Sequence, residues 1–491
     1  MGGTLALLVS AAAVFCYRHG YILYYGDAQS HIDITRSIID SRTPGYDQIG
    51  TVWLPVLHLL CLPFVANDTL WSTGLAGTVP VAACFVVAGL IFYLIAKEVY
   101  GTLIAAVVAT ACLALNPNVL YLAAIPMTEI VFFAGILMLL FALLRFHVTQ
   151  QLRFIALGIA ASWIASLTRY DGWFLIPFAA LFCAAFAARK KAAVFVVFAA
   201  VASLAPLYWV AHNWWERGNA FDFYNGPESA QAIQGGLPYP GRGNWLLSIA
   251  YYSAAGELCA GPALLLAGAV GVVYSIKMKK MAALMFLALT PMFYMWSVHS
   301  AGTPIFVPFL PPYSYYNTRY GIAMVVFAAF AVGAIVASMP RELRKFAPVL
   351  IVFCASPWLL RPSQEHWICW KESQVNSDGR RAWIASGAAY FGARYQKGEG
   401  ILVPMGDVMG IFCRARIPLA EVLHRENGPE WMATIARPDL WHRDAWAVSQ
   451  EGDPVSEGLS RGQATYQAVE VSREPHERGV TIYNRDLPIR R

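Results

Sequence analysis

Acidic and arginine side chains recur where the long apolar runs of this sequence are interrupted. Asp27 follows the first apolar run, and Glu129 precedes a later one. Arg169 stands two residues before Asp171, and Arg319 opens a late apolar run. A carboxylate can accept a proton from an attacking hydroxyl, and a guanidinium can hold a phosphate through two parallel hydrogen bonds. Together these groups could displace a phosphate from a carbon atom.

The elements that carry these residues are expected to be transmembrane helices. The sequence is 58% hydrophobic, and about 20 consecutive apolar residues allow a helix to cross a bilayer. We therefore predict an α-helical polytopic membrane protein with about 11 transmembrane helices. The first apolar run starts almost at Met1, without a basic segment or a cleavage site, and is interpreted as an uncleaved anchor. The expected spans are residues 3–23, 75–96, 102–122, 128–146, 154–168, 173–188, 192–211, 258–276, 281–298, 320–338 and 346–360.

The lysines of residues 1–360 all fall in alternate breaks between these spans. Because lysines accumulate in cytoplasmic loops, these breaks are assigned to the cytoplasm and most carboxylates to the outer face. We expect a multi-pass protein of the cell inner (plasma) membrane whose active site faces the periplasm or exterior; an endoplasmic-reticulum membrane would have equivalent topology. The lysines are Lys97, Lys190, Lys191, Lys277, Lys279, Lys280 and Lys345. Arginines on the outer face have no topological reason to be there, and these are Arg18, Arg36, Arg42, Arg169, Arg217, Arg242 and Arg319.

The composition changes near Arg361, after which acidic and basic residues are equally numerous. We predict that residues 1–362 form the membrane domain, with interface helices at 27–60. Residues 363–491 are predicted to form a soluble α/β domain on the outer face, large enough for a core of its own. The elements expected in it are a helix at 378–396 and strands at 401–404, 466–471 and 479–484.

Asp27 stands at the start of a segment whose apolar residues recur at helical spacing, as in a helix that lies in the membrane interface. His31 would lie one turn later on the same face as Asp27, and Asp33 would lie opposite the apolar residues of the helix. Asp27 could be the N-cap of this helix, which its Gly-Asp-Ala context suits, or a functional acid. Both roles can coexist. The apolar positions are Ala28, Ile32, Thr35, Ile38 and Ile39.

Arg169 and Asp171 lie at the tip of a hairpin that is expected to be short. The breaks at 145–153 and 189–191 are both cytoplasmic, so the residues between them must cross and return. Each arm then has about 15 residues, or roughly 23 Å, which is less than the ~30 Å of the hydrocarbon core. The tip should lie in a recess below the outer surface. An ion pair there is either a functional site or a structural fastening of the hairpin.

Glu129 and Arg319 each begin an apolar run, and each has an ordinary explanation. A carboxylate complements the positive end of a helix, although a glutamate so close to hydrocarbon is costly without a partner or water. Arg319 beside a helix N-terminus suits a phosphate, or its side chain could extend to lipid head groups. The aromatic residues of this region, including Tyr320, could stack on a sugar or belong to the interfacial belt.

The order of these features resembles the GT-C glycosyltransferases. A first span followed by Tyr25-Gly26-Asp27-Ala28, two interface helices, an acid before the fourth span, a late Arg319-Tyr320 and an outer C-terminal domain are similar to one group of them. This is the protein O-mannosyltransferase and aminoarabinose-transferase-like group, of family 39 type. The resemblance covers the whole membrane part and rests on short motifs. It implies a GT-C-like fold and transfer of a sugar from a polyprenyl-phosphate donor to an unidentified glycan, lipid or protein acceptor at the outer face.

Three residues match functional positions of that group. Asp27 matches the first-loop acid that serves as catalytic base, Glu129 is similar to the second-loop acid, and Arg319 to the late arginine near the donor phosphate. Many relatives have a second acid directly after the first, whereas Ala28 stands here, which leaves His31 or Asp33 as a substitute. We expect Asp27 and Glu129 to be catalytic. The residues expected to bind substrate are His31, Asp33, Arg169, Asp171, Arg319 and Tyr320.

No metal or other cofactor is expected, although some relatives with oligosaccharyl donors use a divalent cation. The first-loop spacing is not a metal signature, and no Cys–His spacing indicates zinc. Cys369 and Cys413 could pair on the outer side. The side chains that could ligate a divalent cation are Asp27, His31, Asp33 and Glu129.

Two other classes of function remain open. A transporter or lipid flippase would place polar sites at the bilayer midplane and often has inverted repeats, whereas the charges here gather at the outer mouth and no repeat is found. A non-catalytic glycolipid-binding membrane protein would use the C-terminal domain to recruit a partner. Membrane lipid is an expected partner in every case, and nucleic acid is not.

Overall fold

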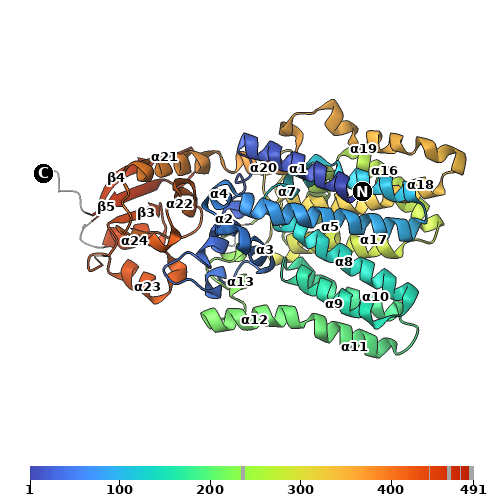
Figure 1. Ribbon diagram of the computed structural model, residues 1–491, viewed down its shortest axis with the longest axis horizontal. Helices are drawn as coiled ribbons and strands as arrows, with labels where there is room; N and C mark the ends of the chain where they lie inside the picture. Colours follow the sequence, from blue (N-terminus) through green and yellow to red (C-terminus); the bar gives the residue numbers. More distant parts are fainter. Residues whose placement is uncertain (234–237, 442, 462–465, 476, 486–491) are drawn as a thin grey trace. The chain divides into compact units, whose positions relative to one another are not determined.

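The computed structural model describes residues 1–233, 238–441, 443–461, 466–475 and 477–485, and the chain forms two compact units (Figure 1). The first, the helical unit, comprises Met1–Cys16, Thr51–Val56 and Val81–Glu372. The second, the mixed unit, comprises Tyr17–Gly50, Leu57–Pro80 and Ser373–Arg491. The segment predicted to form interface helices is therefore divided between the units.

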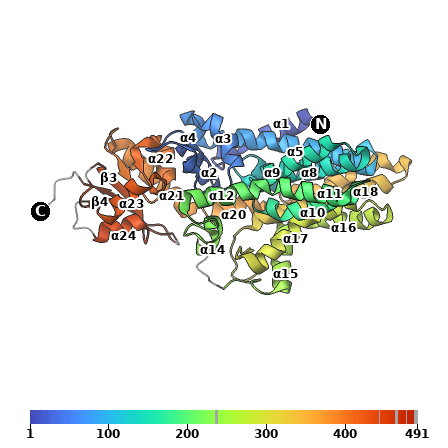
Figure 2. The same cartoon turned by 90° about the horizontal axis from the view of Figure 1, so that it is seen from below.

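The helical unit is built from helices that run roughly parallel to one another, as Figures 1 and 2 show. Every segment predicted to span the membrane is helical. The helices are α1 (Gly2–His19), α5 (Leu75–Tyr100), α6 (Leu103–Ala114), α7 (Pro117–Ala123), α8 (Thr128–Thr149), α9 (Leu152–Ser166), α10 (Asp171–Phe186), α11 (Lys191–Ala202), α12 (Leu204–Arg217), α13 (Asp222–Asn225), α14 (Ala230–Ile233), α15 (Trp245–Ala260), α16 (Pro262–Lys277), α17 (Ala282–Trp296), α18 (Ile322–Ser338) and α19 (Pro348–Leu360). A 3₁₀ turn, η3 (Thr318–Gly321), leads into α18.

Length and apolarity support the membrane class but leave the number of spans as a prediction. In the described part of the chain, 6 helical stretches are long and apolar enough to cross a bilayer, or up to 8 if each of two bent pairs is one span. The pairs are α6–α7, bent by 70°, and α15–α16, bent by 107°. The α-helical polytopic class is confirmed, while the predicted total of eleven is not tested by these helices.

Small residues let the central helices approach closely. Gly268 and Gly271 of α16 face α18, and a Cβ at Gly271 would lie only 2.1 Å from the carbonyl oxygen of Ala331. Such small-residue contacts are typical of helix pairs in membranes, where close van der Waals packing replaces the hydrophobic effect. α8 is the most enclosed of the long helices, with 78% of its apolar window buried. Its N-terminus is therefore a position inside the protein.

The hairpin predicted to be short is short. Its arms are α9, with 15 residues, and α10, with 16 residues. At about 1.5 Å per residue, neither arm reaches the ~30 Å of the hydrocarbon core. The depth of its tip in a membrane stays a prediction.

The mixed unit contains a five-stranded sheet with strand order β2-β1-β3-β5-β4. β1 is parallel to β2 and β3, whereas β5 is antiparallel to β3 and β4. The predicted α/β class is thus confirmed, and β2 and β3 are strands that the sequence patterns did not predict. The strands are β1 (Ile401–Leu402), β2 (Val422–Leu423), β3 (Trp446–Gln450), β4 (Gln467–Ser472) and β5 (Val480–Asn484). The helices are α2 (Gly26–Ser37), α3 (Val56–Val65), α4 (Asp68–Thr73), α20 (Ile368–Val375, shared with the helical unit), α21 (Asp378–Arg394), α22 (Met409–Ala415), α23 (Pro429–Ala436) and α24 (Pro454–Arg461).

The core of the mixed unit includes residues from the two ends of the chain. Ile32 of α2 and Trp71 of α4 pack with Trp383, Phe391 and Phe412 in one buried cluster. Several polar residues of α2 are buried as well, and among them Asp33 and Arg36 pair within this unit. The first interface helix and the C-terminal segment therefore share one core.

The proposed pairing of Cys369 with Cys413 is wrong, since all nine cysteines are free. Cys369 belongs to the helical unit, where its sulfur lies 4.0 Å from that of Cys259. Cys413 is buried in the core of the mixed unit. The two cysteines were considered as a pair because both lie in the segment after Arg361.

Candidate active site

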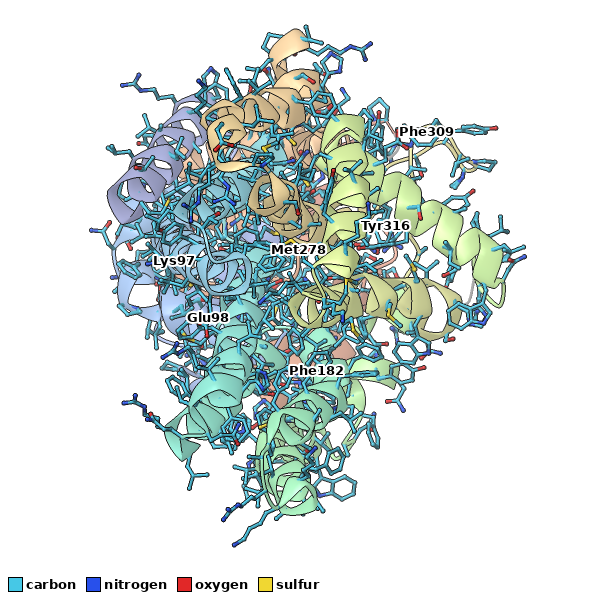
Figure 3. All side chains as sticks on the ribbon, turned by 90° about the vertical axis from the view of Figure 1, so that its right-hand side faces the viewer. Lys97, Glu98, Phe182, Met278, Phe309 and Tyr316 are labelled. Carbon is cyan, nitrogen blue, oxygen red and sulfur yellow. The ribbon has the colours of Figure 1, made fainter. Side chains whose placement is uncertain are left out.

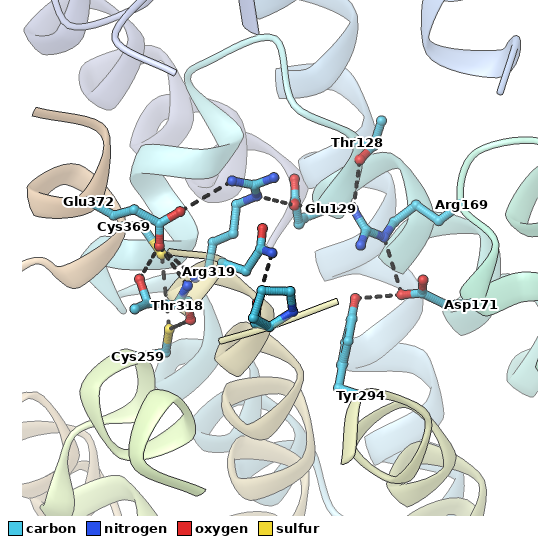
Figure 4. A network of polar contacts seen from close by, with 12 residues as sticks. Thr128, Glu129, Arg169, Asp171, Cys259, Tyr294, Thr318, Arg319, Cys369 and Glu372 are labelled. Carbon is cyan, nitrogen blue, oxygen red and sulfur yellow. Dashed lines mark hydrogen bonds and ion pairs between the residues drawn. The ribbon is translucent and has the colours of Figure 1, made fainter. Parts of the chain in front are cut away.

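Glu129 is the central residue of a buried polar cluster at the N-terminus of α8 (Figure 4). Its side chain is 1% exposed. Its Oε1 accepts hydrogen bonds from Nη1 of Arg169 at 3.2 Å and from Nε of Arg319 at 3.1 Å. Its Oε2 is buried and has no hydrogen-bond partner in the described part of the chain. A carboxylate that only complemented the positive end of α8 would not need two arginine partners. Complementing the helix end is therefore not a sufficient explanation for Glu129.

Arg169 reaches this cluster from the tip of the α9–α10 hairpin. Its Nε donates to Oδ2 of Asp171 at 3.2 Å, and its Nη1 donates to Oγ1 of Thr128 at 2.9 Å. Its Nη2 has no hydrogen-bond partner among the residues described. The tip can close tightly because Gly172 faces the end of α9, where a Cβ would come within 2.6 Å of the Ala165 carbonyl carbon.

Tyr294 of α17 holds the other side of Asp171. Its hydroxyl donates a 2.5 Å hydrogen bond to Oδ2 of Asp171, the oxygen that also accepts from Arg169. The Asp171 carboxylate therefore fixes the Arg169 guanidinium from the side away from Glu129. Figure 4 shows Asp171 between Tyr294 and Arg169.

Arg319 enters the cluster from η3, the turn that begins α18. Besides Glu129, it contacts Glu372, whose Oε1 accepts from Nη1 of Arg319 at 3.2 Å. The ring of Tyr320 lies beside both guanidinium groups, with its centroid 5.0 Å from Cζ of Arg169 and 5.3 Å from Cζ of Arg319. Cation–π attraction adds to the ion pairs at such distances.

These residues form one continuous chain of charges, Glu372–Arg319–Glu129–Arg169–Asp171, which we call the ion chain. All five side chains are at most 13% exposed. Burying a charge is costly unless it is paired and hydrogen-bonded, and each member here has an opposite partner. Among the described residues, the hydrogen bonds of the ion chain use neither Oε2 of Glu129 nor the Nη2 group of Arg169.

The sequence identified four of the five members of the ion chain, but in isolation from one another. The structure brings Glu129, Arg169, Asp171 and Arg319 together, with Tyr320 against them. Glu372 was missed because it lies beyond the predicted end of the membrane domain. Its only signal in the sequence is an acid that follows the apolar stretch Ile368–Trp370.

The other predicted site residues, Asp27, His31 and Asp33, lie on α2 in the mixed unit. Asp27 is half-buried in the first turn, and the N-cap residue is Tyr25, so the interpretation of Asp27 as the cap is wrong by two positions. The helix start differs because the chain already turns helical at Gly26.

His31 and Asp33 both have partners inside the mixed unit. Nδ1 of His31 lies 3.0 Å from Nε2 of His58, and both rings are buried. Asp33 accepts hydrogen bonds from Nε1 of Trp71 at 2.9 Å and Nε2 of Gln29 at 2.8 Å. Burial raises the pKa of Asp33 from 3.8 to about 7, against the lowering effect of these two hydrogen bonds. Both side chains therefore have partners inside the mixed unit, and their part in substrate binding stays a prediction.

Metal ligands do not converge anywhere in the residues that the structure describes: no group of three or more His, Cys, Asp or Glu side chains could hold an ion. The four residues considered as ligands from the sequence are divided between the units, with Glu129 in one and Asp27, His31 and Asp33 in the other.

Two solved structures have a similar fold. They are ArnT from Cupriavidus metallidurans bound to undecaprenyl phosphate and the same protein in the apo state. Each superposes with a TM-score of 0.57 at 12% sequence identity, over 98% of this chain and 98% of the other. No protein-family model matches the sequence, and no curated protein matches it. The chain thus has the fold of ArnT along nearly its whole length, which agrees with the fold class predicted from the sequence.

Proposed function

We propose that the protein is a glycosyltransferase that moves a sugar from a polyprenyl-phosphate donor to an acceptor at the outer face of the membrane. The observation that carries this proposal is the buried Glu129 carboxylate, which lies between two arginines and has one oxygen without a hydrogen-bond partner among the described residues. The fold supports it, because ArnT was solved with undecaprenyl phosphate bound.

The reaction requires a base and a stabilised leaving group. An acceptor oxygen forms a bond to the anomeric carbon, and the bond from that carbon to the phosphate oxygen breaks. The electron pair leaves with the polyprenyl phosphate, and the acceptor proton passes to a carboxylate. Asp27 is the proposed base, as the family resemblance implies. Glu129, through Oε2, would accept a hydrogen bond from a sugar or acceptor hydroxyl.

Arg169 would contact the phosphate through its Nη2 group. Its Nε and Nη1 are held by Asp171, Thr128 and Glu129, and the hydrogen bonds of the described residues leave the two N–H bonds of Nη2 unused. A guanidinium already oriented by Asp171 loses little freedom when an anion binds. Arg319 would act through its charge and by fixing Glu129.

The proposed orientation follows from the lysine-bearing ends of the helices. Lys97 lies in the last turn of α5, and α16 ends at Lys277, next to its C-cap residue Met278. Figure 3 shows the end of the helical unit that carries Lys97, Glu98 and Met278. We assign this end to the cytoplasm and the ion chain to the outer half of the membrane. The host membrane would be a bacterial plasma membrane.

The test is turnover of a panel of polyprenyl-phosphate sugars by the full-length protein in nanodiscs, with candidate glycan, lipid and peptide acceptors. Wild type should consume one donor and release polyprenyl phosphate, and Asp27→Asn should not. Full transfer by Asp27→Asn would remove Asp27 as the base. If no donor is consumed but lipid moves between leaflets, the protein is a flippase and the proposal is wrong.

A further inference from the structure

Glu372 caps a helix to which it is not adjacent in sequence. Its Oε2 accepts from the backbone N–H of Thr318 at 2.6 Å and of Arg319 at 3.4 Å, and also from the hydroxyl of Thr318. These amides belong to η3, whose own N-cap residue, Asn317, makes no side-chain cap hydrogen bond. An acid at this position meets the unsatisfied N–H groups of a helix start. Glu372 thus supplies the missing cap from another segment.

The same carboxylate also holds the side chain of Arg319. Oε1 accepts from Nη1 of Arg319 at 3.2 Å, while Oε2 serves the backbone. One side chain therefore fixes both the turn on which Arg319 stands and the direction in which its guanidinium points. The opposite edge of that guanidinium contacts Glu129 through Nε.

Glu372 is itself anchored by the segment before it. The backbone N–H of Cys369 donates to Oδ1 of Asn118 at 3.0 Å, and Nδ2 of Asn118 donates to the carbonyl of Cys259 at 3.1 Å. The sulfur of Cys259 contacts the carbonyl of Thr318 at 3.3 Å. The ends of α7, α15 and η3 are thereby joined to the first turn of α20. The position of Glu372 is determined by the helical unit, in which its side chain is 2% exposed.

We propose that Glu372 is a positioning residue for the transfer reaction: it orients Arg319, and through Arg319 it holds the Glu129 carboxylate with Oε2 turned to the substrate. This inference rests on the proposed function and goes beyond it, because it gives Glu372 a role that acts through Arg319. A small displacement of a group in an active site can lower the rate about 100-fold, so an indirect role can have a large effect.

Two substitutions separate positioning from simple structural support. In Glu372→Gln, one amide oxygen remains as an acceptor, so the side chain can still cap η3 but cannot also accept from Arg319. In Glu372→Ala, both contacts are lost. Glu365→Gln is the matched control, because Glu365 lies in the same segment, is half-exposed and pairs only with Lys371 in the interactions described.

The experiment combines donor turnover in nanodiscs with hydrogen–deuterium exchange of the peptide that covers residues 315–325. We expect Glu372→Gln to lower kcat about 10- to 100-fold, with the KM for the donor changed less than about threefold and exchange close to wild type. Glu372→Ala should lose turnover and exchange faster, and Glu365→Gln should behave as wild type.

Wild-type turnover in Glu372→Gln would overturn the inference and leave the proposed function intact. If the peptide 315–325 exchanges in Glu372→Ala as it does in wild type, Glu372 does not stabilise η3 as a cap. If wild type consumes no donor, the proposed function fails and the catalytic role of Glu372 fails with it. The exchange data would still show whether Glu372 orders the turn that carries Arg319.

Discussion

Replacing Glu129 by glutamine tests whether the ion chain needs a negative charge at its centre. The amide has nearly the same shape, and its oxygen can accept from both Arg169 and Arg319. An exposed ion pair contributes about 0.2–1 kcal/mol, whereas leaving a buried charge without any partner costs about 3–5 kcal/mol. After the substitution Arg169 still pairs with Asp171, and Arg319 still pairs with Glu372. The loss of folding free energy should therefore fall between these two limits. We expect a destabilisation of about 2 kcal/mol.

The effect of this substitution on catalysis should be larger than its effect on stability. The unpartnered Oε2 of Glu129 becomes an amide group that donates instead of accepting, so a substrate hydroxyl loses its partner. Loss of a positioned carboxylate typically lowers the rate by about 10²–10⁴-fold. We expect kcat for the polyprenyl-phosphate sugar to fall about 100-fold or more, measured in nanodiscs beside thermal unfolding.

Glu98→Gln is the matched control for this experiment. Glu98 is also in an ion pair of the helical unit, 3.5 Å from Arg145, but it is partly exposed and lies at the lysine-bearing end (Figure 3). Its replacement should leave turnover unchanged. If Glu129→Gln shifts the unfolding temperature yet retains full turnover, Glu129 only fastens the two arginines and the reasoning about Oε2 is refuted.

Three further substitutions test the remaining parts of the structure. Arg169→Lys should lower kcat/KM for the donor about 100-fold, because an ammonium group cannot pair with Glu129 and Asp171 and also bind the phosphate. If an arginine-to-lysine substitution far from the ion chain lowers kcat/KM equally, Arg169 has no specific role. Tyr294→Phe removes the hydroxyl that donates to Asp171, and should cost about 1 kcal/mol of stability and lower kcat about fivefold; unchanged kinetics would mean that Asp171 needs no help in orienting Arg169. Burial raises the pKa of Asp33 to about 7, so the folded state binds this proton more tightly than the unfolded chain and stability should rise as pH falls from about 7 towards 4. The difference in unfolding temperature between wild type and Asp33→Asn measures the contribution of Asp33 to the pH dependence of stability. If this difference is the same at pH 8 and at pH 5, Asp33 is not protonated on folding.

Local patterns in the sequence were enough to locate the helices and the short hairpin. Apolar run length predicts spans because each span is a continuous segment with its own hydrogen bonds. The short arms of the hairpin follow from the distance between Arg153 and Arg189, which needs no tertiary information. The same reasoning cannot count spans where helices bend, as at α15–α16, since a bend divides one apolar run without changing its composition.

Contacts between distant segments were beyond such patterns. Glu372 lies 53 residues from Arg319, and nothing local distinguishes it from Glu365, which is half-exposed. The polar side of α2 was expected to complement a membrane interface, but Asp33 is buried with Trp71, because α2 is part of the mixed unit's core. The polar face of a helix can contact either water or polar side chains of another segment, and its sequence does not distinguish the two.

The arginines that the lysine pattern assigns to the outer face are the sequence feature from which the site could have been inferred as a whole. Lysine distribution follows the membrane, so an arginine on the outer face must be retained for another reason. Among the residues described, Arg42 pairs with the buried Asp444, Arg169 and Arg319 share the buried Glu129, and Arg36 pairs with the partly buried Asp40, each within its own unit. Guanidinium suits such sites better than ammonium, because its planar fork can meet two carboxylates at once. In the helical unit this geometry produces an acid shared by two arginines: both donate to Oε1 of Glu129, and Oε2 is left without a hydrogen-bond partner among the described residues.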